Sequence, residues 1–455
     1  MNCFRHSRKI FIVSLTLLVL YVLWAAVSLE KRSAKSLVIK DEPSQQQWDY
    51  RGQEDVSTTA TAITHHPSTT AAGVGSRLVE RPSLAVPADT SPLSKLRRTV
   101  LELNAKETVQ NAGKFPPLTD EGLVIVVQVH KRLGYLRHLL RSLQEAKGIE
   151  DVLLVISHDY YDEQINEAVR EITFCKVLQI FYPHSAQLFP DTFPGPSKND
   201  CPRDISKAGA VAMNCTNALH PDTYGHYREA HFTAIKHHWW WKINTVFDHL
   251  TTTSTYSGYI ILLEEDHFLS PDFVDVTRKL ISLVNLRCAD CDLINLGTYS
   301  LGSYHDIGNK VTTEAWNAGK NNMGFGMNRH TWNMLKTCAK EFCTHDDYNW
   351  DWTLQSLGYS CLKRTIKVMV IKAPRVFHIG SCGGVHHSAT ACNPDEAAQT
   401  VRSHLTSQKP HLFPSSLDLY DNSNMPPASR GMNYGGWGDL RDHNLCMSYS
   451  TKGAS

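Results

Sequence analysis

The stretch GLVIVVQVHKRLGYLRHLLRSLQEAKGIEDVLLVISHD, residues 122–159, decides the fold class. Residues 122–129 and 152–156 are almost continuously apolar, as is typical of strands that are buried on both faces of a sheet. Between them, apolar residues at 133, 136, 139, 140 and 143 recur at helical spacing. The order strand, helix, strand predicts two parallel strands in an α/β domain.

The same pattern continues along the chain. Residues 162–172 have the pattern of a second helix, and KVLQIFYP (176–183) and YIILLEED (259–266) are further buried strands. A long helix that contains KHHWWWK (236–242) precedes the last of them. We therefore expect a mostly parallel sheet that helices cover on both faces. Ligands bind such sheets at the carboxyl ends of the strands.

Polar residues follow three of the predicted strands at that edge. They are Gln128, His130, Lys131 and Arg132 after the first strand, His158 and Asp159 after the second, and Glu264, Glu265 and Asp266 after the fourth. Any one group is explained equally well as the solvated start of a loop. Three adjacent carboxylates repel one another, however, and a divalent cation relieves that repulsion. His378 follows another apolar strand, with His386 and His387 as competing candidates, and a site of carboxylate and imidazole ligands suits Mn²⁺.

The N-terminal part of the chain has a different character. Residues 10–29, IFIVSLTLLVLYVLWAAVSL, form an uncharged apolar run whose length favours a membrane-spanning anchor over a cleaved signal peptide. Residues 30–92 are rich in Ser, Thr, Gln, Ala and Pro without an apolar period, which predicts a flexible stem. We expect residues 1–9 to be a cytoplasmic tail and residues 93–455 to be one catalytic domain, because no second linker interrupts them.

Charge and cysteine content restrict the setting of the protein. The 455 residues include 46 Lys and Arg and 45 Asp and Glu, a balance that does not favour nucleic-acid binding. Of the 12 cysteines, all but Cys3 follow the apolar run, and their spacing fits disulfides in an oxidising lumen better than tandem zinc sites. The large C-terminal part is therefore expected in the lumen, as in a type II membrane protein. The odd number of luminal cysteines leaves one thiol free, and we predict that it is Cys175. Asn214-Cys215-Thr216 has the pattern of an N-glycosylation site.

Six ordered blocks of sequence carry a resemblance to a known family. They are KHHWWWK (236–242), LLEEDH (262–267), LGTYS (296–300), DDYNWDWTLQ (346–355), RVFHIGSCG (375–383) and GGWGDLRDHNLC (435–446). Together they resemble the N-acetylglucosaminyltransferase II family of Golgi enzymes, over about residues 118–446. The resemblance implies a GT-A fold, an α/β sandwich that binds a nucleotide sugar. It also implies Mn²⁺-dependent, inverting transfer of GlcNAc from UDP-GlcNAc, in β-1,2 linkage, to the α-1,6-linked mannose of an N-glycan that already bears GlcNAc on its α-1,3 arm.

The resemblance further implies roles for individual residues. Asp266 and His378 match the metal ligands, and Asp351 matches the catalytic base. The residues that match the nucleotide-sugar site are Gln128, Val129, His130, Lys131, Arg132, Asp159, Ala234, Ile235, Lys236, His237 and His238, and we add Glu264 and Glu265 to them. Those that match the acceptor site are Arg203, Asp222, Tyr299, Asn322 and Trp350. The implied disulfides are Cys201–Cys215, Cys288–Cys291, Cys338–Cys361, Cys343–Cys446 and Cys382–Cys392.

Several alternatives stay open on the residues alone. Asp346, Asp347 and Asp351 are also residues that favour the start of a helix, and Trp350 is equally a candidate for the core. A glycosidase with paired carboxylates and an inactive relative that binds glycans remain rival functions. The loop LGSYHDIG (301–308) lacks the arginine that the resemblance leads us to expect. The oligomeric state is open between a monomer and a homodimer.

Overall fold

The computed structural model describes residues 91–380, 393–420 and 425–451, which we call the described residues. All of them belong to one compact unit, Ser76–Ser455. None of the helices in this part of the chain is long and apolar enough to cross a bilayer. The predicted tail 1–9, the predicted anchor 10–29 and nearly all of the predicted stem 30–92 lie outside the described residues.

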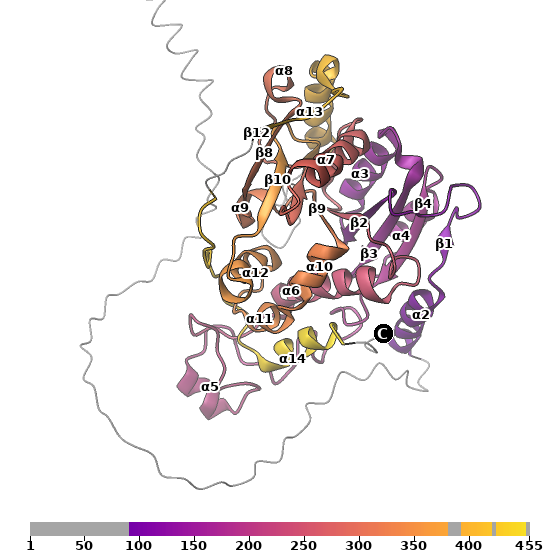
Figure 1. Cartoon of the computed structure of the whole chain (residues 1–455). Coiled ribbons are helices and arrows are strands. Elements are labelled where there is room, and N and C mark those ends of the chain that lie inside the picture. The colour runs from indigo at the N-terminus through magenta and orange to yellow at the C-terminus, as the bar shows by residue number, and fades with distance from the viewer. Residues whose placement is uncertain (1–90, 381–392, 421–424, 452–455) are drawn as a thin grey trace, which may run out of the picture. The chain divides into compact units, whose positions relative to one another are not determined.

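A ten-stranded mixed sheet runs through the unit (Figure 1), in the order β1-β4-β3-β2-β5-β9-β7-β10-β8-β12. Its strands are β1 Val109–Gln110, β2 Leu123–Val129, β3 Val152–His158, β4 Lys176–Phe181, β5 Tyr259–Glu264, β7 Leu293–Asn295, β8 Lys310–Ala315, β9 Phe325–Asn328, β10 Lys367–Ile371 and β12 Asp418–Tyr420. The four strands predicted from their apolar runs are adjacent and parallel, with Val127 opposite Ile156 of β3 and Leu263 of β5. The prediction of a parallel sheet is confirmed for this half. The other half is mixed, because β9 is antiparallel to both β5 and β7, and β8 is antiparallel to β10.

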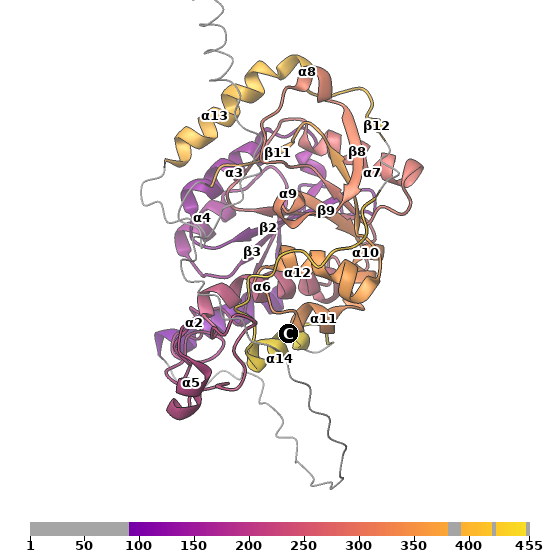
Figure 2. The ribbon, with the colours of Figure 1, turned by 90° about the vertical axis from the view of Figure 1, so that its left-hand side faces the viewer.

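Helices cover both faces of the sheet, as predicted (Figures 1 and 2). One face of β2, which includes Ile125 and Val127, packs in one hydrophobic core with α3 Leu133–Glu145, α4 Glu163–Arg170 and α7 Phe273–Arg287. The opposite face, with Val124 and Val126, packs in a second core with α6 Ala230–Asn244, α10 Arg329–Lys336 and α12 Trp350–Leu357. The alternation of side chains along a strand divides these residues between the two cores. The result is a three-layer α/β/α sandwich.

Further helices complete the unit. They are α2 Pro92–Lys106, α5 Lys207–Met213, α8 Tyr304–Ile307, α9 Ala318–Asn321, α11 Ala339–Thr344, α13 Pro394–Ser407 and α14 Leu440–Ser448, with short helical turns at Ile149–Asp151, Thr245–His249, Gly358–Leu362 and Lys409–His411. The Ser91 hydroxyl caps the N-terminus of α2 by accepting from the Ser94 N–H (3.2 Å). Helix α5 lies apart from the sheet, at the end of the unit that carries α14 (Figures 1 and 2).

A separate two-stranded ribbon forms next to the end of β5. It pairs β6 His267–Leu269 with β11 Val376–His378 in antiparallel register, so that His267 lies opposite His378. Buried Arg375 anchors the ribbon, because its Nε donates to the Asp272 carboxylate (2.9 Å) and its guanidinium also donates to two backbone carbonyls. The ribbon thereby joins two segments that are more than a hundred residues apart in sequence.

Disulfides connect distant parts of the unit. The structure forms Cys201–Cys215, Cys288–Cys291, Cys338–Cys361 and Cys343–Cys446, four of the five pairs that the resemblance implies. The fifth expected pair, Cys382–Cys392, lies outside the described residues, as do His386 and His387. Cys175 is a free, buried thiol, which confirms that prediction. Asn214 of the sequon follows α5 in the left-handed conformation (φ 54°) and is exposed.

Candidate active site

The register of the parallel strands brings the predicted polar residues to one edge of the sheet. Gln128 at the end of β2 pairs with Glu264 at the end of β5. The Glu265 N–H donates to the Gln128 carbonyl (3.0 Å), and the Asp159 N–H donates to the Val129 carbonyl (3.2 Å). The three acids and Asp159 therefore flank the end of β2, where a ligand of a parallel sheet binds.

Arg132 holds two of the acids. Its Nε donates to Glu265 Oε1 (2.6 Å), and its Nη1 lies 2.8 Å from Asp266 Oδ2. The other Glu265 oxygen accepts from the His130 N–H. Burial acts to lower the pKa of Arg132, but the charges of Asp266 and Glu265 outweigh burial and raise it. Glu265 thus serves as a buried anchor for the start of α3, next to the acid that was predicted to bind metal.

The β6–β11 ribbon brings His378 to Asp266. His378 Nε2 lies 3.2 Å from Asp266 Oδ2, and the Ile379 N–H donates to the Asp266 backbone carbonyl (2.9 Å). Burial acts to raise the pKa of the Asp266 carboxyl, but the hydrogen bond and charge of His378, with the charge of Arg132, lower it well below its ordinary value. The two predicted metal ligands, which are 112 positions apart by their numbers, are therefore adjacent in the fold.

The surroundings of Asp266 fit a divalent cation. Its Oδ1 is buried and has no hydrogen-bond partner among the described residues, a costly state for a carboxylate oxygen unless a cation or water meets it. Glu264, Asp266 and His267 each offer a ligand atom within 4.8 Å of the others. A Cβ at Gly380 would lie only 1.9 Å from Asp266 Oδ2, so no other residue fits beside this carboxylate. Oxygen and imidazole ligands of this kind suit Mn²⁺.

His267 is a candidate ligand that sequence reasoning missed. It is buried, and its Nδ1 accepts from the Glu264 N–H (3.1 Å), so His267 binds a cation only where it gives up that hydrogen bond or the proton on Nε2. The signal lies in LLEEDH itself, since an acid and a histidine at the end of a strand are both metal-ligand types. Only the pairing of β6 with β11 shows that this histidine faces the same centre as His378.

Lys242 is a second missed residue, buried below the acids. Its Nζ donates to Gln128 Oε1 (2.7 Å). Burial lowers the pKa of Lys242, against the charges of Glu264 and Asp159. Burial has the opposite effect on the Glu264 carboxyl: it raises the pKa of Glu264, and the charge of Asp266 raises it further. Lys242 therefore fixes the Gln128 side chain at the end of β2 and interacts electrostatically with Glu264 and Asp159.

Asp159 organises the other side of the edge. Its Oδ1 lies 2.6 Å from His130 Nδ1, and its Oδ2 lies 3.8 Å from Nδ1 of buried His238. His238 Nε2 in turn lies 2.8 Å from the Ser157 hydroxyl. Lys131 is exposed and places its Nζ 4.0 Å above the ring of Tyr160. A cation, an imidazole and a carboxylate thus line the ends of β2 and β3, where a nucleotide is expected.

The predicted base, Asp351, lies in the first turn of α12. Its Oδ2 accepts from Asn322 Nδ2 (2.9 Å), and its Oδ1 accepts from the Trp352 N–H (2.8 Å). Burial raises the pKa of Asp351 to about 6, although both hydrogen bonds act to lower it. The carboxyl group is held in one orientation and ionises near neutral pH, as a general base requires.

A chain of polar contacts connects Asp351 to the acidic centre. The Tyr299 hydroxyl donates to Asn322 Oδ1 (3.1 Å), which orients the Asn322 amide so that its Nδ2 faces Asp351. The Tyr299 ring lies edge-on to the His378 ring, with centroids 6.0 Å apart. Asn295 of β7 fixes the turn that carries Asn322, because its Nδ2 donates to the carbonyls on either side of it (2.9 and 3.0 Å). Base and acidic centre therefore belong to one site.

Five predicted site residues lie elsewhere. Trp350 is 6% exposed and stacks on Trp239 (centroids 4.7 Å apart, interplanar angle 3°), so it belongs to the core and presents no open ring face to a sugar. Lys236 is fully buried, and its Nζ donates to the carbonyls of His345 (2.9 Å) and Asp347 (2.8 Å). His237 is buried against Asp442 (2.8 Å). Ala234 and Ile235 are partly exposed on α6, and within 234–238 only His238 approaches Asp159.

Arg203 and Asp222 share the lobe that carries α5. Arg203 forms ion pairs with Asp204 and with Glu229 (3.1 Å). The Asp222 carboxylate is buried and accepts from the backbone N–H groups of Tyr224 (2.9 Å) and Gly436 (2.7 Å), among others. Asp222 therefore shapes the loops of the lobe and ties them to the segment after residue 434.

Comparison with known proteins agrees with this site. Residues 97–446 match the sequence model of the family described as N-acetylglucosaminyltransferase II (MGAT2). The chain belongs to the N-acetylglucosaminyltransferase II family. Relatives named alpha-1,6-mannosyl-glycoprotein 2-beta-N-acetylglucosaminyltransferase are 44% identical in Mus musculus, covering 83% of this chain and 87% of the relative, and 43% identical in Homo sapiens, covering 84% and 87%. The relative of that name in Arabidopsis thaliana is 33% identical and covers 75% and 78%.

Membership of the N-acetylglucosaminyltransferase II family makes the chain a glycosyltransferase. It also agrees with the resemblance seen in the six sequence blocks, which fall within or at the edges of the matched residues. The acidic centre and Asp351 are therefore the candidate active site of a glycosyltransferase. The glycosidase alternative loses its support.

Proposed function

We propose that this enzyme transfers GlcNAc from UDP-GlcNAc, with inversion and in β-1,2 linkage, to the α-1,6-linked mannose of an N-glycan that already bears GlcNAc on its α-1,3 arm. The names of the relatives support this substrate and linkage. The observation that supports the proposal most is the link from His378 through Tyr299 and Asn322 to Asp351, because Asp351 as a base would then be next to the centre that would hold the diphosphate.

Asp266 and His378 would hold a Mn²⁺ ion, with Glu264 and His267 as further candidates. When bound, such an ion acts as a Lewis acid that neutralises the negative charge developing on the departing diphosphate. Because Gly380 has no side chain, the Asp266 carboxylate fits beside it. The pairing of β6 with β11 fixes the position of His378. The protein thereby supplies a preorganised set of oxygen and nitrogen ligands.

Asp351 takes the proton of the mannose 2-hydroxyl while the hydroxyl oxygen attacks the anomeric carbon of GlcNAc. The bond from that carbon to the diphosphate oxygen breaks, and UDP leaves with the bonding electrons. Asn322 and the Trp352 N–H hold the carboxylate in place. A pKa of about 6 lets Asp351 be ionised before the attack and still accept a proton at neutral pH.

Donor binding belongs to the ends of β2 and β3. His130, Lys131 and Asp159 would contact the nucleotide. Arg132 forms ion pairs with Glu265 and Asp266 and so fixes the acidic centre. In the loop 301–308, which lacks the expected arginine, Tyr304 is buried and donates to the Pro374 carbonyl.

We extend the proposal to a GT-A type enzyme of the Golgi membrane, anchored as a type II protein with its disulfide-bonded domain in the lumen.

The test is a transfer assay with the full-length chain, UDP-GlcNAc and an N-glycan that bears GlcNAc on its α-1,3 arm. Mass spectrometry follows the glycan with Mn²⁺ and with a chelator. We expect the addition of one N-acetylhexosamine only with Mn²⁺, and linkage analysis to give β-1,2. Binding of the glycan without addition would identify an inactive relative. Loss of a sugar without UDP-GlcNAc would identify a glycosidase.

A further inference from the structure

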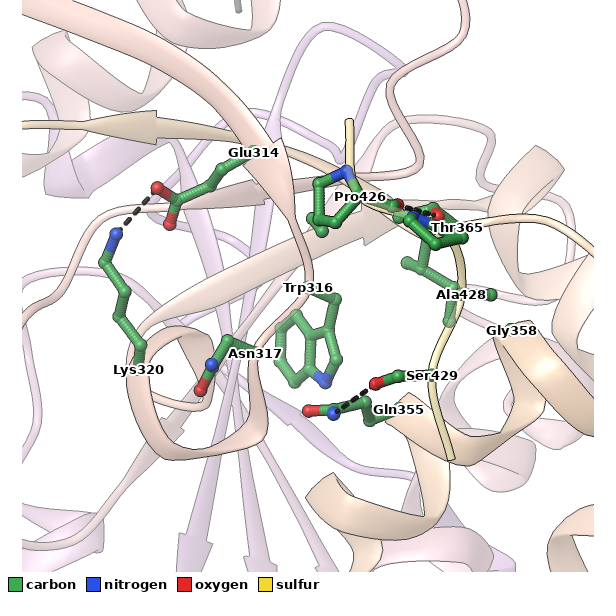
Figure 3. Close-up of a pocket in the computed structure, with 13 residues that line it drawn as sticks. Glu314, Trp316, Asn317, Lys320, Gln355, Gly358, Thr365, Pro426, Ala428 and Ser429 are labelled. Carbon is green, nitrogen blue, oxygen red and sulfur yellow. Dashed lines mark hydrogen bonds and ion pairs between the residues drawn. The ribbon is translucent and has the colours of Figure 1, made fainter. Parts of the chain in front are cut away.

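A pocket of about 360 Å³ opens beside α12, apart from the acidic centre (Figure 3). It lies between the end of β8, α9, α12, the turn after α12 and the segment 426–429. The Trp316 indole lies against it, and Pro426 stands at the opposite wall (Figure 3). None of the roles assigned above uses this pocket.

The pocket and the base share two structural elements. Gln355 lines the pocket and lies one turn after Asp351 on the same face of α12, roughly 6 Å along the helix axis. Gln355 Oε1 accepts from the Ala318 N–H (2.9 Å) at the start of α9, and Asn322, just after α9, donates to Asp351. The Trp316 Nε1–H points to the Asp351 backbone carbonyl (3.4 Å). The pocket therefore lies about one helical turn from Asp351.

The pocket carries no free charge. Its charged lining residues are Glu314 and Lys320, which form an ion pair (2.6 Å; Figure 3). Glu314 also accepts from Asn321 Nδ2 (2.8 Å), so both of its oxygens are occupied. A phosphate or a metal ion needs an unmatched charge at its site. The pocket thus suits a neutral ligand.

Polar groups in the pocket are available to a ligand with hydroxyl groups. Gln355 Nε2 is 3.5 Å from the Ser429 hydroxyl, longer than an ordinary N–H···O bond. Asn317 Nδ2 donates to no other described residue, since only its Oδ1 is engaged, by the Gly319 N–H (3.0 Å). The Thr365 hydroxyl donates to the Pro426 carbonyl (2.7 Å) and keeps its lone pairs. Amide donors and hydroxyl acceptors between an indole and a proline wall match a sugar ring, which has apolar C–H faces and a polar rim.

We infer that this pocket binds a neutral pyranose ring of the acceptor glycan, beyond the mannose that reacts. The inference rests on the proposed function and adds to it a subsite built from Trp316, Asn317, Gln355, Thr365 and Ser429. It is a different place from the lobe that carries Arg203 and Asp222. A ring held here anchors the glycan one helical turn from Asp351 and contributes to binding rather than to the chemical step.

The experiment fills the pocket with Ser429→Trp in the full-length chain. Ser429 is exposed and holds nothing but the 3.5 Å contact with Gln355. The matched control is Ser403→Trp on α13, an exposed serine that accepts a similar contact from Gln399 Nε2 (3.3 Å). Transfer to the branched N-glycan and the Kd for UDP are measured for each variant. Pro427→Trp, at another exposed pocket residue, replaces Ser429→Trp if that variant does not fold.

We expect Ser429→Trp to raise KM for the branched glycan about tenfold and to leave kcat and the Kd for UDP unchanged. Ser403→Trp should change none of these three values. An unchanged KM for the branched glycan overturns the inference. So does a loss of kcat as large as the rise in KM, because it shows only a disturbed α12. Calorimetric titration of the branched glycan without donor gives the same comparison as a Kd. A wild type that transfers nothing would refute the proposed function. Even then, the Kd shows whether the pocket binds the glycan.

Discussion

At the scale of single residues, the proposed transfer reaction depends on one carboxyl group. Asp351 has two hydrogen-bond donors, Asn322 and the Trp352 N–H, and a pKa that burial raises to about 6. An aspartate on an exposed helix start has neither the raised pKa nor the fixed orientation. The neighbouring acids hold other parts of the chain. Asp346 accepts from Thr223, and Asp347 accepts from the Asn349 N–H (2.8 Å).

The pH dependence of transfer follows from this pKa. Only the ionised carboxylate accepts a proton, so kcat/KM should fall as pH decreases through about 6. The Asn322 hydrogen bond acts to lower the pKa of Asp351, and Asn322→Ala should therefore move the acidic limb to higher pH, besides weakening acceptor binding. Profiles of kcat/KM from pH 5 to 8 at saturating Mn²⁺ check both statements. An acidic limb that Asn322→Ala leaves in place would argue against Asp351 as the titrating group.

Gly380 gives a second test at the scale of one atom. Gly380→Ala puts a methyl group where Asp266 Oδ2 lies, since the added Cβ would be 1.9 Å from that oxygen. We expect the Mn²⁺ concentration for half-maximal transfer to rise roughly 10–100-fold, the usual effect of disturbing a group next to a metal ligand. Gly113→Ala is the control, because no atom lies within 4 Å of its added Cβ. Equal Mn²⁺ dependence in the two variants would contradict the assignment of Asp266.

At the scale of elements, α6 shows how one helix serves structure and site together. Its residues are buried nearly all round, and they include two lysines. Lys242 points to Gln128 at the nucleotide edge, whereas Lys236 points the other way, to the loop 345–347 that leads into α12. Lys236 also lies over the Trp437 ring (4.4 Å). Sequence matching placed Lys236 in the nucleotide site, but the direction of its side chain makes it a support for the base.

Lys236→Met should therefore affect stability more than donor binding. Removing the Nζ leaves two buried carbonyls without their donor, and we expect a loss of about 2–4 kcal/mol in the free energy of unfolding. The Kd for UDP should stay within about twofold of the wild type. Chemical denaturation and UDP titration measure the two effects. Lys131→Met, at the exposed edge, should show the reverse, and a large loss of UDP affinity in Lys236→Met alone would return Lys236 to the nucleotide site.

The elements also show where sequence reasoning succeeds. The strands β2, β3, β4 and β5 are continuous apolar runs, so their existence and parallel order were predictable. The strands β7 and β12 have three residues each, too few for any period. Their pairing is decided by contacts between segments far apart in the chain. The antiparallel strand β9 between β5 and β7 could not be predicted for the same reason.

At the scale of the whole molecule, the site is built from distant segments. Strand ends placed Gln128, Asp159 and the three acids at one edge without any structure. His378, Asn322 and Asp351 needed either a resemblance or tertiary contacts, because no local pattern shows that a tyrosine bonds an asparagine 23 positions away. Lys242 and His267 were missed because their roles depend on which way a buried side chain points. The sequence thus predicts which edge of the sheet carries the site, while tertiary packing determines how the site residues are arranged.

The disulfides stabilise this assembly unequally. Cys343–Cys446 spans 103 residues and ties α11 to α14, whereas Cys288–Cys291 spans 3, and all four cysteines are buried. In the loop-entropy model the longer loop contributes about 3 kcal/mol more. Cys343→Ala with Cys446→Ala should therefore lower the melting temperature more than Cys288→Ala with Cys291→Ala. Equal melting temperatures of the two double variants would show that loop closure does not dominate.

The most direct test of the central claim compares Asp351→Asn with the wild type in two measurements at the same Mn²⁺ concentration. The account predicts that transfer to the branched N-glycan falls by roughly 10²–10⁴-fold, the usual contribution of a general base, while the Kd for UDP is unchanged. The metal and nucleotide groups would then be intact and only proton removal lost. Transfer within tenfold of the wild type, or a parallel loss of UDP affinity, would contradict the role of Asp351 as the base.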